Sequence, residues 1–593
     1  MTDYQAPLRD MQFVINELAD LNSLNQLPAF AEATPDLVEA VLEQAAILAG
    51  EVFSPLNHSG DEHGTFIDAG KVVSPSGYAE AFRQFAENGW QGIGKSEAYD
   101  GQGLPFLVHL ATSEMWNSAN LALALCPLLT SGAIEALESH ASEALKQAFL
   151  PRLVSGEWTG TMNLTEPQAG TDLAAIKTRA QRDGDAYRIK GQKIFITWGE
   201  HEMSANIAHL VLARLPDAPE GVKGISLFLV PKYLLNEDGS PGQRNDLQVV
   251  SLESKMGIHS SPTCVMSYGD NDGAVGFLVG EENNGLACMF TMMNNARLEV
   301  GLQGVAISER AYQQALGFAR ERVQGTARGQ SGRSAIIHHP DVRRMLMQMR
   351  AISEAGRALA YVTAAETDRA RQAGDEKSRQ GRQSRVDLLI PIVKGWCTEM
   401  AQEVTYLGVQ IHGGMGFIEE TGAAQYMRDA RILTIYEGTT GIQALDLMGR
   451  KILRDKGAAL TELIAELSDF EKRLSGLQGD FALIAGRFSS ALQATRQARD
   501  YFFEQVSVDE DLAGAGGVDF MMMCGHLLGG WLLARAALAA QAHIDAGDED
   551  VFYRNKINTA LFFAEHILPR SESHSRMLQS GSRSVMSIAA DQM

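Results

Sequence analysis

The chain has 593 residues, of which 45% are hydrophobic and 21% are charged, and its formal net charge is −22. This composition is typical of a soluble globular protein, and the length suggests three or four domains. The negative charge repels nucleic-acid phosphates and anionic membrane surfaces, so we expect neither as a partner. Five scattered cysteines without a C-x-x-C pair argue against a disulfide framework or a cysteine-based zinc site; they are Cys126, Cys264, Cys288, Cys397 and Cys524. We expect no metal.

Two segments bear on localisation. Residues 1–10 have no apolar core and are not typical of a signal peptide. The most apolar stretch, residues 521–540, contains His526 and Arg535, which favours a buried amphipathic helix over a membrane span. We therefore expect a cytoplasmic protein without stable membrane insertion.

The hydrophobic periodicity divides the chain into four predicted domains. Residues 1–157 are helical, 158–283 are β-rich, 284–454 are helical again, and 455–593 form four more helices broken by a Gly-rich linker at 509–517. The fold class is therefore multidomain α+β, with a compact β-barrel or sandwich between helical domains. The short β-rich runs in the second region are 187–197, 207–213, 225–230, 247–252 and 263–268.

Residues Gly89–Ser96 match the phosphate-loop pattern G-x-x-x-x-G-K-S. That motif needs a buried strand before it and a helix after it. Residues 78–88 are polar and helix-like, and residues 97–105 cannot begin a helix. We therefore reject nucleotide hydrolysis.

Two segments of the β-rich region carry polar groups beside glycine. In residues 162–172, Gly170 permits a close backbone approach, and Thr165 and Thr171 offer hydroxyls, although an ordinary Pro-Gly loop explains the same pattern. Residues 195–199 place an aromatic, a threonine and a glycine at a strand end. They are equally compatible with a flat wall against an aromatic ligand and with core followed by a turn.

Two further segments follow in the second helical region. Residues 410–417 contain three glycines in four positions, and their free backbone N–H groups could bind a diphosphate. The alternative is that the segment is only a helix C-cap followed by a loop. In residues 428–443, Glu437 lies between an apolar run and a helix expected to begin near Thr440. It is either a charge favouring the helix N-terminus or, desolvated by the apolar approach, a general base with a raised pKa.

Together the four segments resemble the acyl-CoA dehydrogenase family, in order and in structural context, over residues 1–453. The runs Thr-Glu-Pro-Gln-Ala-Gly-Thr-Asp at 165–172 and Ile-Tyr-Glu-Gly-Thr at 435–439 are the most specific. The C-terminal region and the opening residues 4–11 are similar to the subgroup that includes 3-methylmercaptopropionyl-CoA dehydrogenase. Members acting on longer chains carry a similar C-terminal region, so 3-methylthiopropionyl-CoA and a fatty acyl-CoA both remain candidate substrates.

The resemblance implies an FAD site between the β-domain and the second helical domain. Phe195 stands where many relatives have Trp and is expected to stack on the flavin. Arg322 resembles the arginine that reaches the FAD diphosphate of a neighbouring subunit, although the loop after Arg322 departs from the family pattern. An FAD site shared in this way implies at least a homodimer. The implied cofactor-binding residues are Met162, Leu164, Thr165, Gly170, Thr171, Phe195, Thr197, Arg322, Gln410, Gly413, Gly414 and Thr439.

The resemblance also implies a mechanism in which Glu437 removes the α-proton while a hydride moves from the β-carbon to FAD. Arg297 matches the arginine that orients the base, while Ala296 stands where some relatives carry their base and Glu299 is expected to face elsewhere on its helix. The implied substrate-binding residues are Thr171, Arg297, Tyr436 and Gly438.

Electron-transfer flavoprotein is the electron acceptor that the resemblance implies. An acyl-CoA oxidase or flavin monooxygenase of the same fold is an alternative, since oxygen access cannot be read from the residues. A DNA-associated alkylation-response flavoprotein is a second alternative, but residues 455–593 contain no sustained basic run.

Overall fold

The computed structural model describes residues 4–593, so the first three residues of the expected non-signal N-terminus lie outside the described residues. The chain folds into two compact units, which are treated separately below. The first comprises residues 4–43, Pro105–Glu114 and Arg297–Met593, and the second comprises Gln44–Leu104 and Met115–Ala296. The four domain boundaries drawn from the sequence stay predictions.

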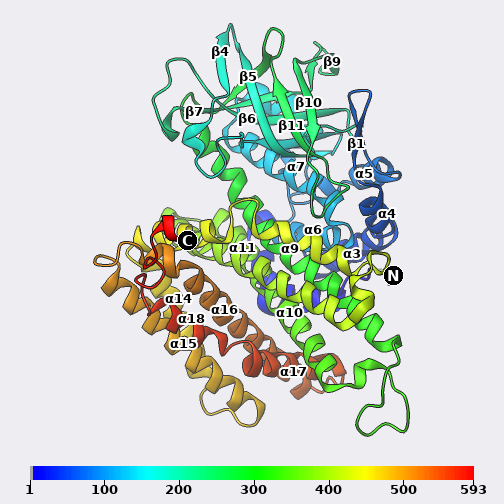
Figure 1. Cartoon of the computed structure of the whole chain (residues 1–593), viewed down its shortest axis with the longest axis vertical. Coiled ribbons are helices and arrows are strands. Elements are labelled where there is room, and N and C mark those ends of the chain that lie inside the picture. Colours follow the sequence, from blue (N-terminus) through cyan, green and yellow to red (C-terminus); the bar gives the residue numbers. More distant parts are fainter. Residues whose placement is uncertain (1–3) are drawn as a thin grey trace. The chain divides into compact units, whose positions relative to one another are not determined.

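An eight-stranded sheet forms the centre of the second unit, with strand order β10-β11-β5-β12-β7-β6-β3 and β4 beside β5 and β6 (Figure 1). β3 and β6 pair in parallel, and the neighbours along the rest of this order are antiparallel. The strands are β3 (Trp158–Asn163), β4 (Arg179–Asp183), β5 (Ala186–Thr197), β6 (Asn206–Arg214), β7 (Ile225–Pro231), β10 (Leu247–Leu252), β11 (Thr263–Tyr268) and β12 (Ala274–Val279).

The five expected β-rich runs coincide with β5, β6, β7, β10 and β11. Three strands of the sheet went unpredicted, because β3 and β4 are rich in polar residues and β12 directly follows a turn. Two small hairpins complete the unit, β1 (Phe66–Asp68) with β2 (Lys71–Val73) and β8 (Tyr233–Leu235) with β9 (Pro241–Arg244).

Helices flank the sheet of the second unit. The helix α7 (Leu121–His140) packs on β3, and Phe149 of α8 (Glu143–Val154) meets Trp158 edge to face at 5.5 Å. The helices α4 (Pro55–His63) and α5 (Tyr78–Glu87) precede them. Because α5 rather than a strand comes before Gly89, the rejection of a phosphate loop is confirmed.

Among the described residues, the regular elements of the first unit are helices, and every strand belongs to the second unit. It begins with α1 (Leu8–Phe13) and α2 (Leu21–Asn25), while α3 (Pro35–Leu48), α6 (Phe106–Ala119) and α9 (Gly285–Glu321) are shared with the second unit. Its centre contains α10 (Pro340–Arg371), α11 (Glu376–His412), α12 (Ala423–Ala430) and α13 (Thr440–Leu445). α10 and α11 make the most extensive helix pair.

The additional C-terminal module contains five α-helices rather than the four expected, because Pro569 separates a short last helix from the one before it. The expected linker at 509–517 is also shorter, since α16 begins at Leu512. Gly516 and Gly517 lie within that helix and allow close packing, Gly516 against Leu578 and Gly517 against Met448. The helices are α14 (Ala458–Leu474), α15 (Asp480–Gln505), α16 (Leu512–Asp545), α17 (Val551–His566) and α18 (Arg570–Leu578).

Two helices, α7 and α16, are long and apolar enough by length and composition to cross a membrane. In each, 89% of the apolar window is buried inside the protein, as in the core helices of globular proteins. The stretch 521–540 lies within α16, so its prediction as a buried helix is confirmed.

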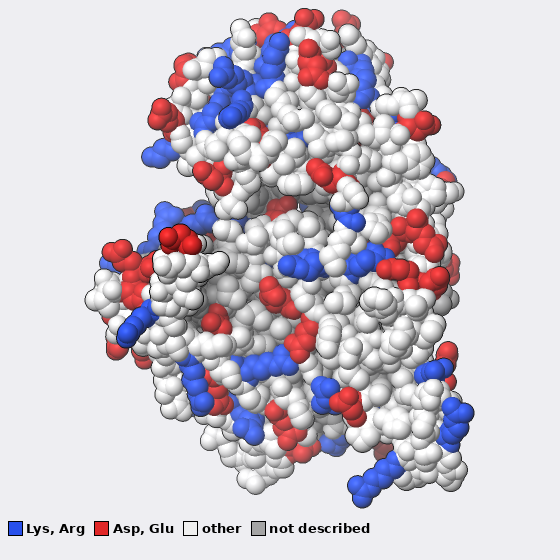
Figure 2. All heavy atoms as spheres, in the orientation of Figure 1, with Lys and Arg blue, Asp and Glu red and all other residues white. Residues whose placement is uncertain are grey.

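Acidic and basic side chains are interspersed on the face drawn in Figure 2.

Candidate active site

The backbone around Glu437 is in a conformation that most residues avoid. Glu437 has φ +54° and the next residue, Gly438, has φ +94°. A left-handed conformation costs a residue with a β-carbon roughly 1–2 kcal/mol, and such strain is concentrated at functional sites. At Gly438 a β-carbon would also lie 2.7 Å from Gln443 Nε2, so only glycine fits.

Two buried side chains hold this strained pair by its carbonyl oxygens. Lys394, on α11 and fully buried, donates from Nζ to the Gly438 oxygen at 2.7 Å. Gln443, on α13, donates from Nε2 to the Glu437 oxygen at 3.0 Å and to the Gly438 oxygen at 3.3 Å. The turn that carries Glu437 is therefore fixed from both α11 and α13.

The electrostatic surroundings of Glu437 suit a proton acceptor. Burial raises the pKa of its carboxyl, while Arg297 and Lys394 oppose that rise. The raised pKa is the direction that the apolar approach in the sequence predicted. A carboxylate that is desolvated yet kept ionisable by two cations is suited to general-base catalysis.

Arg297 is buried on α9 and donates from Nη1 to Asp446 Oδ2 at 3.0 Å. Burial lowers the pKa of Arg297, while Asp446 and Glu437 oppose that lowering. Its Nε–H has no acceptor among the described residues. Glu299 instead lies 3.6 Å from His109 Nε2, so it faces elsewhere on α9, as expected.

The residues that flank Glu437 on the same turn, Tyr436 and Thr439, make hydrogen bonds that fix their side chains. The Tyr436 hydroxyl donates to Gln303 Oε1 on α9. Thr439 caps α13 by accepting the Ile442 N–H at 3.4 Å, and α13 begins at Thr440 as predicted. The backbone N–H of Glu437 makes no hydrogen bond among residues 4–593 and remains available to a ligand.

The Gly-rich segment after α11 has an open backbone. Gly413 ends the helix with φ +59° and donates to the Gln410 oxygen, so the C-cap interpretation is correct locally. A β-carbon on Gly413 or on Gly414 would have no atom within 4 Å, which leaves room for a ligand against both. Gln410 and, directly after α9, Arg322 are exposed.

In the second unit, a buried ion pair attaches residues 162–172 to the strand β5. Lys193 Nζ lies 2.8 Å from Glu166 Oε1 and donates to the Leu164 oxygen at 2.9 Å. The Thr165 oxygen accepts the Ile194 N–H at 2.9 Å. The segment is thus tied to β5, with Met162 buried, Leu164 and Thr165 half-buried, and Gly170 and Thr171 exposed.

Phe195 lies in a bulge of β5, where Ile194 and Phe195 stand opposite the single residue Val265 of β11. At the bulge Phe195 has φ +61° and is 57% exposed as a residue, which is unusual for a large hydrophobic residue within a sheet. Thr197 closes the strand opposite Thr263. The exposed ring is available to an aromatic ligand.

Family models match along most of the chain. They describe the acyl-CoA dehydrogenase N-terminal domain at residues 64–157, its middle domain at 161–270 and its C-terminal domain at 283–453. A fourth, "Acetyl-CoA dehydrogenase C-terminal like", matches residues 462–589. The chain belongs to the acyl-CoA dehydrogenase family.

The chain is similar over nearly its whole length to several named proteins. It is 49% identical to 3-methylmercaptopropionyl-CoA dehydrogenase of Ruegeria pomeroyi, covering 98% of both chains. It is 35% identical to a butyryl-CoA dehydrogenase of Syntrophomonas wolfei, covering 96% of this chain and 95% of that one. The crystal structure of Caenorhabditis elegans ACDH-11 in complex with C11-CoA matches the fold with TM-score 0.75 at 20% identity, covering 96% and 93% of the two chains.

Sequence reasoning missed the residues that hold the site in place, chiefly Lys394, Gln443, Asp446 and Lys193. Lys394 left a signal, because it is the one charge in the apolar run 388–397. The others left none, since their partners are distant in sequence or are backbone atoms.

Proposed function

We propose that the protein is an FAD-dependent acyl-CoA dehydrogenase that converts an acyl-CoA thioester to its trans-2-enoyl-CoA, with Glu437 as the base. The observation that carries this assignment is the part-buried Glu437 carboxylate, held on a strained turn between Arg297 and Lys394. FAD supplies the acceptor for the hydride that leaves the substrate β-carbon.

The residues expected to contact FAD have the chemistry that this cofactor needs. Phe195 offers an exposed aromatic face to the flavin ring, and Thr165 and Thr197 offer hydroxyls at its polar edge. The open backbone at Gly413 and Gly414 suits a diphosphate. Met162, Leu164, Gly170, Thr171, Gln410 and Thr439 are the further proposed contacts.

Arg322 adds a cation for the diphosphate, since it is exposed and forms no ion pair among the described residues. As its relatives' arginine serves a neighbouring subunit, we propose a homodimer or a higher homo-oligomer as the working form. The proposed electron acceptor is electron-transfer flavoprotein, and the proposed location is the cytoplasm.

Proton abstraction follows from the charges around Glu437. The carboxylate takes the α-proton of the thioester, and charge then develops on the thioester oxygen. The unpartnered Glu437 N–H is a donor for that oxygen, and a donor of this kind typically contributes roughly 3–4 kcal/mol to lowering the barrier. Arg297, Tyr436, Gly438 and Thr171 border the substrate in this proposal.

The proposed substrate is a short thioether acyl-CoA, 3-methylthiopropionyl-CoA, because the relative that shares 49% identity is named for it. A straight fatty acyl-CoA is the second candidate, supported by the butyryl-CoA dehydrogenase at 35% identity.

The test is anaerobic titration of the yellow holoenzyme with 3-methylthiopropionyl-CoA, butyryl-CoA and longer acyl-CoAs. We expect one chain class to bleach the flavin fastest in the wild type, and Glu437→Gln to slow bleaching roughly 10²–10⁴-fold. Glu504→Gln, which changes an exposed carboxylate on α15, is the matched control and should bleach normally.

A colourless protein that cannot be reconstituted with FAD would exclude the proposal. Bleaching by Glu437→Gln at the wild-type rate would assign the base elsewhere. Rapid reoxidation of the reduced holoenzyme by oxygen would favour an oxidase or a monooxygenase instead.

A further inference from the structure

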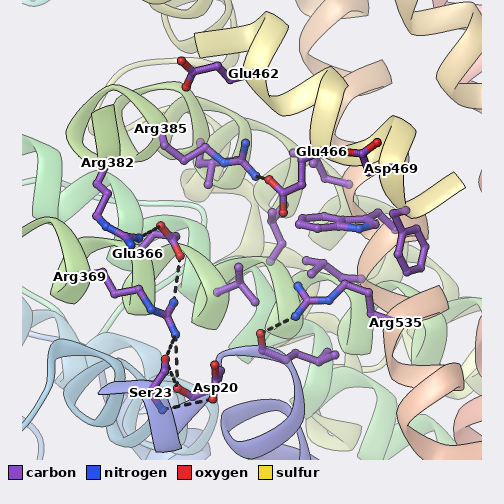
Figure 3. Close-up of a pocket in the computed structure, with 18 of the residues that line it drawn as sticks. Asp20, Ser23, Glu366, Arg369, Arg382, Arg385, Glu462, Glu466, Asp469 and Arg535 are labelled. Atoms are coloured by element: carbon purple, nitrogen blue, oxygen red, sulfur yellow. Dashed lines mark hydrogen bonds and ion pairs between the residues drawn. The ribbon is translucent and has the colours of Figure 1, made fainter. Parts of the chain in front are cut away.

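The first unit contains a cavity of about 700 Å³ that none of the proposed active-site residues lines. Its walls come from α10, α11, α14 and α16 and from the chain around Asp20, so the C-terminal module helps to form it (Figure 3). Its volume is within the range of small-molecule sites, which is roughly 300–1,000 Å³.

One part of the cavity wall is apolar. The residues that form it are Leu359, Leu389, Phe470, Leu528, Trp531 and Leu532. All of them are at least nine-tenths buried, so the cavity reaches the hydrophobic core of the unit. An alkyl or aryl group placed there would leave water for an apolar surface.

Five arginines and five carboxylates surround this wall, and the charges do not pair off completely. Arg369 and Arg382 both pair with Glu366, at 2.9 and 3.3 Å, and Arg385 pairs with Glu466 at 2.7 Å. Figure 3 shows these pairs at the cavity.

Arg473 and Arg535 form no ion pair among the described residues. The Arg473 guanidinium lies 5.7 Å from the centre of the Phe470 ring, and that of Arg535 lies 5.1 Å from the Trp531 ring. Arg535 donates from Nη2 to the Leu18 oxygen at 3.0 Å, its one hydrogen bond among residues 4–593. Two cations therefore lie at the apolar wall without a carboxylate partner.

The surroundings of Arg535 disfavour its charged form. Burial lowers its pKa and the nearby cations Arg473 and Arg369 add to that lowering, while Glu466 and Asp20 oppose it. Trp531 is 5% exposed, and its Nε1–H has no acceptor within residues 4–593. An acceptor that entered the cavity with a negative charge would relieve the repulsion between the cations and reduce the number of unpartnered donors nearby.

We propose that this cavity is a binding site for an amphipathic carboxylate, with its carboxyl group at Arg473 and Arg535 and its apolar body against Phe470, Trp531 and Leu389. A carboxylate suits the site better than a phosphate dianion, because Glu462, Glu466 and Asp469 also line it and repel a second negative charge. The planar guanidinium groups suit the two oxygens of a carboxylate. This site is independent of the proposed reaction.

The probe is sodium decanoate, titrated calorimetrically into the holoenzyme at constant ionic strength. We expect one decanoate per chain, no change in the flavin spectrum, and weaker binding of decan-1-ol. Arg535→Gln and Arg473→Gln should each weaken decanoate binding roughly 10- to 100-fold, the usual effect of removing a charged hydrogen-bond donor.

Arg473 is exposed, so its variant tests the site without disturbing the core, and Arg487→Gln on α15 is the matched control for lost surface charge. Undetectable decanoate binding would overturn the proposal. So would decanoate binding by both arginine variants with the affinity of the wild type. A flavin spectral change with the same midpoint as the calorimetric titration would also overturn it, because it would place decanoate in the acyl-CoA site.

Discussion

Lys394 Nζ donates a 2.7 Å hydrogen bond to the carbonyl oxygen of Gly438, 44 residues further along the chain. The lysine is fully buried, and burial lowers its pKa to about 8, while the charges of Glu437 and Glu399 oppose that lowering. It is therefore charged at neutral pH. One side chain of α11 thus both fixes the turn that carries Glu437 and opposes the rise that burial causes in the pKa of its carboxyl.

Replacing Lys394 with methionine should move the pH dependence of flavin bleaching. Lys394 opposes the raised pKa of Glu437, so removing its charge raises that pKa further. Because the base must be ionised, the loss of rate at acid pH should begin at a higher pH than in the wild type. The measurement is the bleaching rate under saturating acyl-CoA across the pH range.

Gln443→Leu is the matched control, because it removes a neutral donor to the same carbonyl oxygen without removing a charge. We expect a slower rate with an unshifted pH profile. An identical profile for Lys394→Met and the wild type would restrict Lys394 to a structural role.

Gly438→Ala should slow catalysis and destabilise the protein, whereas Gly441→Ala should do neither. The first adds a β-carbon at φ +94° and 2.7 Å from Gln443 Nε2, and we expect a loss of about 1–3 kcal/mol in unfolding free energy. At Gly441 the nearest atom, Thr439 Oγ1, is 4.0 Å away, and alanine in α13 should stabilise by about 0.4–1 kcal/mol. The measurements are the thermal unfolding midpoints and the flavin bleaching rates of both variants. Equal midpoints and equal rates in the two variants would mean that the conformation of Gly438 is not required.

Lys193→Met should weaken FAD binding from the second unit. It leaves Glu166 buried without its cation, and breaking a buried pair in this way costs about 3–5 kcal/mol. Residues 162–172 would then be held to β5 by the Thr165–Ile194 hydrogen bond without the ion pair. The measurement is the dissociation constant of FAD for the reconstituted apoprotein, with Lys190→Met, an exposed lysine on the same strand, as control. Unchanged affinity would show that this segment does not depend on the ion pair.

The same pair makes stability depend on pH. Burial opposes the ionisation of Glu166, but Lys193 and hydrogen bonds lower its pKa from 4.5 to about 2. A folded-state pKa below the unfolded value stabilises the fold above about pH 4.5, and this contribution is lost as the pH falls toward 2. Glu166→Gln should therefore show less acid dependence of unfolding over that range than the wild type.

Lys556→Met should loosen the C-terminal module. Lys556 lies on α17 and pairs with Asp10 at 2.5 Å and with Glu354 at 2.7 Å, while Arg357 reaches Asp10 at 2.6 Å. Removing the lysine leaves two carboxylates short of positive charge, at a cost of about 3–5 kcal/mol. Urea denaturation measures the loss, and the exposed Lys472→Met should change stability by less than about 1 kcal/mol. Equal stability of the two variants would contradict this account.

Periodicity predicted the element types well where packing follows the local pattern. The β-rich run at 187–197 is β5, and the run at 263–268 is β11. Hydrophobic periodicity did not predict strands whose burial depends on tertiary contacts of polar side chains. β3 is fully buried although its sequence is Trp-Thr-Gly-Thr-Met-Asn, because its hydroxyls find partners such as His209 on the adjacent strand, at 2.7 Å from Thr161.

The sequence by itself determined the family and singled out Glu437, because the reaction requires particular residue types in short runs such as Ile-Tyr-Glu-Gly-Thr. It also predicted that the base is desolvated, since the preceding residues are apolar. Only the tertiary structure decided which groups fix the turn that carries Glu437 and which charges set the pKa of its carboxyl. Lys394 and Arg297 act on Glu437 from α11 and α9, and Asp446 in turn pairs with Arg297. An electrostatic interaction depends on distance in space, which the order of residues along the chain does not specify.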